Sequence, residues 1–191
     1  MDDFNLHSLN ESRNEYSALL IGKLTPLLFE GIKSIFKEAY ELCKSNDENE
    51  KYLMTFQNFL SRVSKWNQTL VETETERIIK RSGCDYLEDL LSCVYINQLK
   101  ILTSMRVGSK QKQIDIDIPR LSDFIHRVYV YVARKVYKNV YLFDMGASPI
   151  DKQKNVREIE TMIRESILEV IRDGMPIERI LRAYLDKTVE E

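Results

Sequence analysis

Three residue types in the chain could support nucleophilic or metal chemistry, and each lacks the partners that this chemistry needs. Cys84 follows Gly83 at an expected helix start, where the helix dipole favours a thiolate. A cysteine nucleophile also requires a general base, which no sequence signal supplies. His126 has no cysteine or second histidine at ligand spacing, so we expect a packed or surface histidine. Cys93 lies in an apolar helical pattern and is predicted to be core.

Two carboxylates, Asp115 and Asp117, flank Ile116 and would point the same way from a strand. Such a pair could share a divalent cation, but we favour solvated acids on an amphipathic strand. No phosphate-binding glycine motif occurs, and Gly108-Ser109-Lys110 precedes a strand pattern rather than a helix. The residues therefore predict a protein that is not an enzyme and that has no metal or cofactor.

Charge is distributed in blocks along the chain. Residues 92–143 contain 9 Lys/Arg and 3 Asp/Glu, a formal charge of +6. Residues 1–91 contain 11 Lys/Arg and 16 Asp/Glu, a formal charge of -5. Residues 144–191 contain 8 Lys/Arg and 11 Asp/Glu, a formal charge of -3. A basic centre can attract an anionic partner, or the acidic flanks of the same fold or of a neighbouring copy.

The basic block also suggests an alternative in which one helix binds nucleic acid. Its cations are Arg127, Arg134, Lys135 and Lys138, and Tyr129, Tyr131, Tyr137 and Tyr141 are interleaved with them over residues 122–143. Cations bind a phosphate backbone and aromatic rings stack on bases. The sequence pI of about 5.9 is low for a dedicated nucleic-acid domain, and the tyrosines also fit a helix core.

The elements that would position these residues are mainly helical. The chain has 191 residues, of which 43% are hydrophobic, and only 6 Gly and 4 Pro, which leaves little room for all-β architecture. We predict a single-domain bundle of about six or seven helices over residues 12–191, preceded by a mobile arm at 1–11. Its three cysteines are too few and scattered for a disulfide framework, no stretch is apolar enough to span a membrane, and no signal peptide is evident.

Apolar residues at three- and four-residue steps predict the individual helices. The expected ranges are about 12–44, 51–81, 85–105, 122–143, 149–173 and a short helix from 176. Pro26 predicts a break or kink near Thr25. Ser148-Pro149 is a strong helix start, and Gly83 a helix stop.

One short β element is expected near residues 106–118, where isoleucine alternates with aspartate. A single strand must lie on a helix layer, pair with a hairpin arm, or pair with a partner chain. An unpaired strand edge is a template for another chain. The predicted partner-binding residues are Arg106, Lys110 and Lys112 at the rim and Ile114, Ile116 and Ile118 in the ladder.

Four stretches of the chain resemble a known family. They are Thr55-Phe-Gln-Asn-Phe-Leu-Ser-Arg-Val-Ser-Lys-Trp-Asn67, Glu74-Thr-Glu-Arg-Ile78, Ser82-Gly-Cys-Asp-Tyr-Leu-Glu-Asp-Leu90 and Lys100-Ile-Leu-Thr-Ser104. Over about residues 20–185 the chain resembles an uncharacterised family of nucleocytoplasmic large DNA viruses, including mimivirus-like and algal viruses. The shared motifs consist of packing and capping residues, so the resemblance carries over no catalytic residue.

The resemblance implies a viral protein made in host cytoplasm. Together with the charge blocks, it predicts a non-enzymatic interaction protein, a virion structural or assembly-associated component. The expected location is the virion or the viral factory in the host cytoplasm. Its expected partners are other viral proteins or a second copy, with a nucleic-acid-associated regulatory factor as the alternative. This step is one of association, because fold and family do not fix function.

Overall fold

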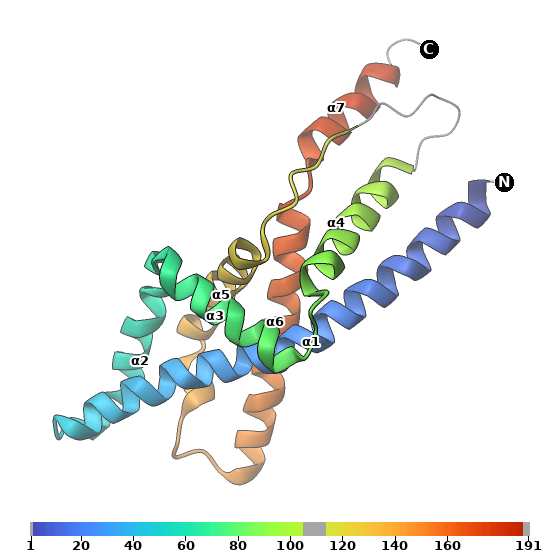
Figure 1. The fold of residues 1–191 in the computed structure, drawn as a ribbon. Helices are drawn as coiled ribbons and strands as arrows, with labels where there is room; N and C mark the ends of the chain where they lie inside the picture. Colours follow the sequence, from blue (N-terminus) through green and yellow to red (C-terminus); the bar gives the residue numbers. More distant parts are fainter. Residues whose placement is uncertain (1, 105–113, 189–191) are drawn as a thin grey trace.

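The computed structural model describes residues 2–104 and 114–188, and these form a single helical bundle (Figure 1). As predicted, the fold is mainly α, with seven α-helices and no strand among the described residues. The α-helices are α1 (Asp2–Ser45), α2 (Tyr52–Ser61), α3 (Gln68–Ser82), α4 (Leu87–Ser104), α5 (Leu121–Lys138), α6 (Pro149–Asp173) and α7 (Ile177–Thr188). The 3-10 helices are η1 (Asn49–Lys51), η2 (Val63–Lys65) and η3 (Val140–Phe143).

Helix α1 is the spine of the bundle. Its 44 residues span about 66 Å at 1.5 Å per residue, and α2, α3, α4 and α6 pack along it (Figure 1). Leu20, Leu24, Leu28 and Ile32 recur at helical spacing and are fully buried. Helix α5 completes the core by packing against α2, α3 and α6.

Helix α1 differs from its prediction in two ways. It begins at Asp2 rather than near residue 12, because backbone bonding extends into a stretch whose sequence shows no apolar period. It also runs through Pro26 as one helix, so the predicted break is absent, while a kink near Thr25 stays a prediction. Pro26 is exposed, and buried Leu24, Leu27 and Leu28 hold the helix on both sides of it. Whether residues 1–11 are mobile stays a prediction.

The predicted helix at 51–81 is two helices. Helix α2 ends at Ser61, and α3 begins after Asn67, whose extended backbone and side chain form an N-cap: Leu70 N–H donates to Asn67 Oδ1 at 2.8 Å. The sequence was misleading because the apolar stripe continues across this break. Other predicted caps are confirmed, since Gly83 ends α3 at φ 61° and Ser148 caps α6 with Pro149 in its first turn.

The predicted β element is not a strand in its described part. Residues 114–120 are extended but unpaired, and residues 106–113 lie outside the described range. The alternation itself is correct: Ile114, Ile116 and Ile118 are half-buried while the intervening aspartates are exposed. Ile116 and Ile118 pack against the core, so the two-residue period arises from packing on helices rather than from a ladder.

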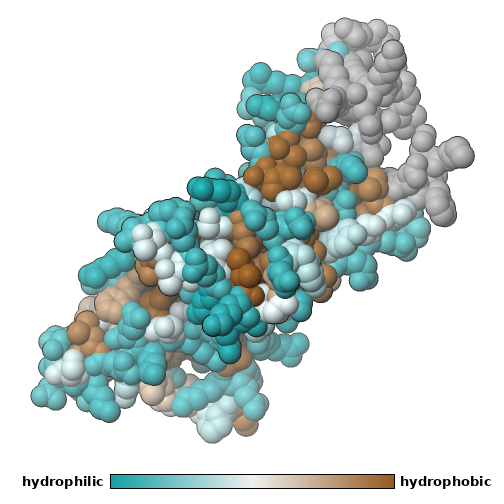
Figure 2. Space-filling model, viewed as in Figure 1, coloured by the Kyte–Doolittle hydropathy of each residue, from teal (hydrophilic) through white to brown (hydrophobic). Residues whose placement is uncertain are grey.

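One residue that the sequence predicts to be core lies at the surface. Cys93 is exposed because α4 buries the face that carries Leu91, Val94 and Tyr95. Figure 2 shows hydrophilic residues over most of one face and hydrophobic residues gathered near the end where α7 lies. Among the described residues, no helix is long and apolar enough to cross a membrane.

Candidate functional site

The cations of the predicted basic helix fall into two groups in the structure: those neutralised by an ion pair, and those exposed without an ion pair to a described residue, which we call open cations. Lys135 Nζ lies 2.8 Å from Glu169 Oε1 and 3.7 Å from Glu165 Oε2, so this lysine joins α5 to α6. Its charge is therefore balanced within the fold. Arg134 and Lys138, on the neighbouring outward positions, are exposed and make no ion pair with any residue that the structure describes.

Arg134 and Lys138 stand beside a small groove between α2, η2 and α5. The groove has a volume of about 250 Å³. Its lining is Leu60, Ser61, Val63, Ser64, Val130, Ala133, Arg134, Tyr137 and Lys138. The floor is largely apolar and the two cations stand at the same place, so this surface combines a hydrophobic recess with positive charge. We call it the α5 groove.

The tyrosines predicted to accompany the cations also fall into two groups, those bonded within the fold and those exposed. Tyr129 is fully buried, and the hydroxyl of Tyr131 donates to Asp173. Tyr137 and Tyr141 are 46% and 60% exposed. Tyr137 and Tyr141 are therefore the most exposed of the four tyrosines: Tyr137 lies in the last turn of α5, near Arg134 and Lys138, and Tyr141 follows in η3.

The other predicted contact residues contribute less to one continuous surface. Arg127 is exposed but lies about two helical turns from Arg134 and about three from Lys138 along α5, in a cavity that Asp117 and Asp173 also line. Arg106, Lys110 and Lys112 lie outside the described residues. Ile116 and Ile118 pack on the chain's own core, and Ile114 is half-buried.

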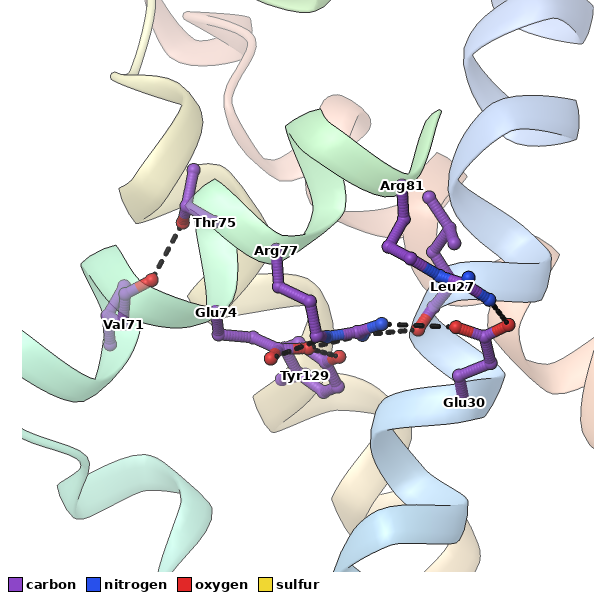
Figure 3. Close-up of polar contacts among 8 residues, drawn as sticks. All are labelled: Leu27, Glu30, Val71, Glu74, Thr75, Arg77, Arg81 and Tyr129. Atoms are coloured by element: carbon purple, nitrogen blue, oxygen red, sulfur yellow. Dashed lines mark hydrogen bonds and ion pairs between the residues drawn. The ribbon is translucent and has the colours of Figure 1, made fainter. Parts of the chain in front are cut away.

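A charged cluster that sequence reasoning missed joins α1, α3 and α5 (Figure 3). Arg77 donates from Nε and Nη2 to the two carboxylate oxygens of Glu74, at 2.9 and 2.6 Å. It also donates to Glu30 Oε2 at 3.1 Å and to the carbonyl oxygen of Leu27 at 2.8 Å. Arg81 donates to the other Glu30 oxygen at 2.8 Å. One arginine thus fixes α3 to α1 through a forked geometry that lysine cannot provide.

Tyr129 completes this cluster from α5. Its hydroxyl donates to Glu74, and its ring lies against Gly31 of α1, where an added Cβ would be 1.9 Å from the hydroxyl oxygen. Burial raises the pKa of Tyr129 well above its ordinary value, with a further contribution from Glu74. The hydrogen bond from Arg81, together with the charges of both arginines, lowers the pKa of Glu30. We call Glu30, Glu74, Arg77, Arg81 and Tyr129 the Arg77 cluster.

The Arg77 cluster forms one wall of an open groove of about 670 Å³ between α1, α2 and α3. Phe59, Trp66 and Leu70 supply apolar surface in the same groove. Its central acids and bases already bond one another, so they fix the helices rather than present unmatched charge. The only sequence signal was the three-residue spacing of Glu74 and Arg77, which identifies a helix pair but not its contacts with α1 and α5.

His126 and Cys84, the candidate catalytic residues, are packed into the fold. His126 Nε2 donates to the carbonyl oxygen of Val63 at 2.8 Å and the ring stacks on Trp66, with 6.0 Å between centroids. This confirms a packed histidine. Cys84 is 1% exposed. Within residues 2–104 and 114–188, no group of three or more His, Cys, Asp or Glu side chains could hold a metal ion.

The fold and these surfaces define an α-helical bundle with one internally paired charge cluster and one open cationic groove. A family model described as a family of unknown function, DUF5764, matches residues 6–144, and the chain belongs to this family. The match covers α1 from residue 6 onward, all of α2 to α5, and the Arg77 cluster. No curated protein and no solved structure matches the chain.

Proposed function

We propose that this protein is a non-enzymatic interaction protein that binds an acidic segment of a partner protein in the α5 groove. One observation carries the proposal: Arg134 and Lys138 are exposed without ion pairs in the described part of the chain, whereas Lys135 between them is neutralised by α6. Two cations held on one rigid helix attract an anionic partner and orient it.

The apolar floor of the α5 groove supports a protein segment as the occupant. Leu60, Val63 and Ala133 form the base of a recess of about 250 Å³ and are almost fully buried. Half-buried Val130 and exposed Tyr137 supply the apolar surface that one or two side chains of a partner could contact. Interfaces typically place an apolar anchor in a recess and charges at its rim. The expected partner segment therefore carries one or two large apolar residues next to Asp or Glu.

The biological setting that we propose is a large DNA virus, with the protein acting in the virion or in assembly in the host cytoplasm. The resemblance of the quoted sequence stretches supports this setting. Residues 106–118, including Arg106, Lys110 and Lys112, remain a proposed second contact. Mass spectrometry of purified particles should detect the protein if it is structural, and its absence at deep coverage would contradict that role.

Nucleic-acid binding is the second candidate, and one observation favours it. The exposed rings of Tyr137 and Tyr141 alternate with Arg134 and Lys138, which would let bases stack while cations contact phosphates. Two open cations provide a small footprint, so we rank this function below protein binding. It predicts binding to oligothymidine that weakens steeply with added salt.

A peptide titration tests the proposal and separates the two candidates. The probe is a fluorescent glutamate-rich helical peptide with two leucines at positions i and i+4, compared with the same peptide carrying alanines and with labelled oligothymidine. We expect the leucine peptide to bind most tightly. The Arg134→Glu/Lys138→Glu variant should lose about tenfold in affinity or more.

A matched charge reversal provides the control for this titration. Lys80 on α3 and Lys152 on α6 are exposed and do not line the α5 groove. The Lys80→Glu/Lys152→Glu variant should bind the leucine peptide like the unaltered protein. Equal losses in both variants, or equal binding of the leucine and alanine peptides, would contradict a specific groove. Tighter binding of oligothymidine would favour the nucleic-acid function.

A further inference from the structure

Tyr95 of α4 is the one buried side chain of the described residues whose polar atom has no hydrogen-bond partner. The residue is fully buried and its hydroxyl oxygen bonds to no described residue. Leaving a buried hydroxyl unsatisfied costs about 1–3 kcal/mol, and such groups are uncommon in folded proteins. The ring is held tightly, since an added Cβ on Gly174 would lie 2.7 Å from Tyr95 Cε1.

Tyr95 lines a cavity of about 500 Å³ formed by α4, α5, the end of α6 and the extended segment before α5, and its hydroxyl oxygen would lie 3.0 Å from a Cβ added to Gly174, which lines the same cavity. The cavity is lined by Tyr95, Asp117, Ile118, Pro119, Asp123, His126, Arg127, Asp173 and Gly174. Three carboxylates and the guanidinium of Arg127 thus line one cavity. The carboxyl-terminal end of α6, at Asp173, adds the negative end of a helix dipole.

The three carboxylates differ in how they are already engaged. Asp123 accepts a hydrogen bond from Arg120 at 3.3 Å, and Asp173 accepts one from Tyr131. Asp117 is exposed and makes no ion pair with a described residue. With Arg127 in the lining and Arg120 on Asp123, two guanidinium charges offset three carboxylates, so one negative charge remains in excess near an unsatisfied phenol oxygen.

We propose that this cavity binds a primary ammonium group, which donates hydrogen bonds to Tyr95 Oη and to the carboxylates of Asp117 and Asp173. An ammonium has three donors and no acceptor, which matches one phenol oxygen and two carboxylates. The group is either that of a free alkylamine or polyamine or that of a lysine side chain on a partner. The proposal is independent of the α5 groove, because it uses different residues.

Titration with butylammonium, followed by NMR chemical shifts of the full chain, tests this site. Butanol is the control ligand, since it has the same carbon chain without charge. We expect butylammonium to move signals of residues around Tyr95 and Gly174 with a dissociation constant in the range of about 1–10 mM, as the few atoms of this ligand allow. Butanol should leave those signals in place.

Three variants distinguish the proposed contacts. Asp117→Asn should weaken butylammonium binding by about tenfold, and Tyr95→Phe by about threefold. Asp115→Asn is the matched control, because Asp115 is an exposed neighbour that does not line this cavity. That variant should change affinity by less than about twofold. Circular dichroism will confirm that each variant is folded, which we expect because both aspartates are exposed.

Two further ligands separate the sources of the ammonium. Spermidine binding more tightly than a lysine-containing peptide would indicate a free polyamine, and the reverse order would indicate a partner's lysine. The proposal is overturned if saturating butylammonium moves no signal near Tyr95, which is the result expected if the hydroxyl is buried without any partner. Equal shifts with butanol, or unchanged affinity in Asp117→Asn, would overturn it as well.

Discussion

The Arg77 cluster and the α5 groove are both built from arginine, tyrosine and neighbouring charges, yet they use their cations differently. Arg77 donates four hydrogen bonds to groups on α1 and α3 and shares Glu74 with a fully buried tyrosine. Arg134 is exposed and makes no ion pair in the described part of the chain. The contrast teaches that a basic segment must be separated into helix-fixing cations and open cations before it is interpreted as a binding surface.

If this contrast is correct, the largest loss of stability should come from adding a side-chain atom inside the Arg77 cluster, where α1 packs against Tyr129. In Gly31→Ala, the new Cβ would lie 1.9 Å from the hydroxyl oxygen and 2.8 Å from Cζ of Tyr129, which is buried and cannot move aside. We expect the free energy of unfolding to fall by about 3 kcal/mol in urea denaturation. Gly22→Ala is the control.

Gly22 lies in the same helix, and a Cβ there would meet nothing within 4 Å. Replacing it with alanine should raise the free energy of unfolding by about 0.5–1 kcal/mol, because glycine disfavours helix interiors. Equal effects of the two substitutions would show that Tyr129 is not held against α1 as described.

The next largest effect should come from removing the arginine at the centre of the cluster. Arg77→Met leaves the mostly buried Glu74 with Tyr129 as its remaining partner, so we expect a loss of about 2–3 kcal/mol. Arg134→Met on the open surface should change stability by less than about 0.5 kcal/mol. Thermal or urea unfolding of both variants checks the comparison. A similar loss of unfolding free energy in Arg77→Met and Arg134→Met would contradict the distinction between helix-fixing and open cations.

Two buried tyrosines sharpen the comparison further. Tyr129→Phe removes the donor to Glu74 and should cost about 1–2 kcal/mol in the free energy of unfolding. Tyr95→Phe removes a hydroxyl that has no partner, so stability should stay unchanged or rise by up to about 1 kcal/mol. Burial raises the pKa of Tyr95 to about 12, so both hydroxyls are neutral at pH 7 and charge does not complicate this comparison. A marked loss in Tyr95→Phe would contradict the unsatisfied hydroxyl.

The smallest expected effect is a pH dependence from Glu30. Arg81 and Arg77 lower its pKa in the folded state below the ordinary 4.5. Its stabilising contribution is therefore complete above about pH 4.5 and is lost as pH falls through the folded value. The side chain is 42% exposed, so the effect should stay below about 1 kcal/mol.

Urea denaturation between about pH 6 and pH 3 will measure this dependence. Glu30→Gln should lose less stability than the unaltered protein on acidification. Arg81→Met should show the same trend, because it removes the largest cause of the lowered pKa. A steeper loss of stability in either variant would reverse the expected sign.

Local signals predicted much of this fold, and the failures have identifiable physical causes. Ser148-Pro149 and Gly83 were sufficient to place one end each of α6 and α3, because caps depend on neighbouring residues. The break at Asn67 was missed because its cap lies inside a continuous apolar stripe. The Arg77 cluster was missed because Glu30 and Tyr129 are distant in the sequence from Arg77, and only packing brings the three together.

The α5 groove was half predicted. Its cations belong to the basic helix that the sequence identified, but nothing in the sequence indicates that Glu165 and Glu169 neutralise Lys135. The alternating isoleucines were identified correctly as having one buried face, while their partner surface, the chain's own core, depends on tertiary structure. Side-chain period therefore predicted burial, and not what each residue contacts.

The most direct test of the function is to map where the leucine-containing glutamate peptide contacts the protein by amide hydrogen exchange. We predict that added peptide slows exchange in residues 60–64 and 130–138 and that the Arg134→Glu/Lys138→Glu variant loses this protection. Protection confined to the groove of Phe59 and Trp66 beside the Arg77 cluster, or no protection at a concentration that saturates the unaltered protein, would contradict the assignment of the α5 groove as the docking surface.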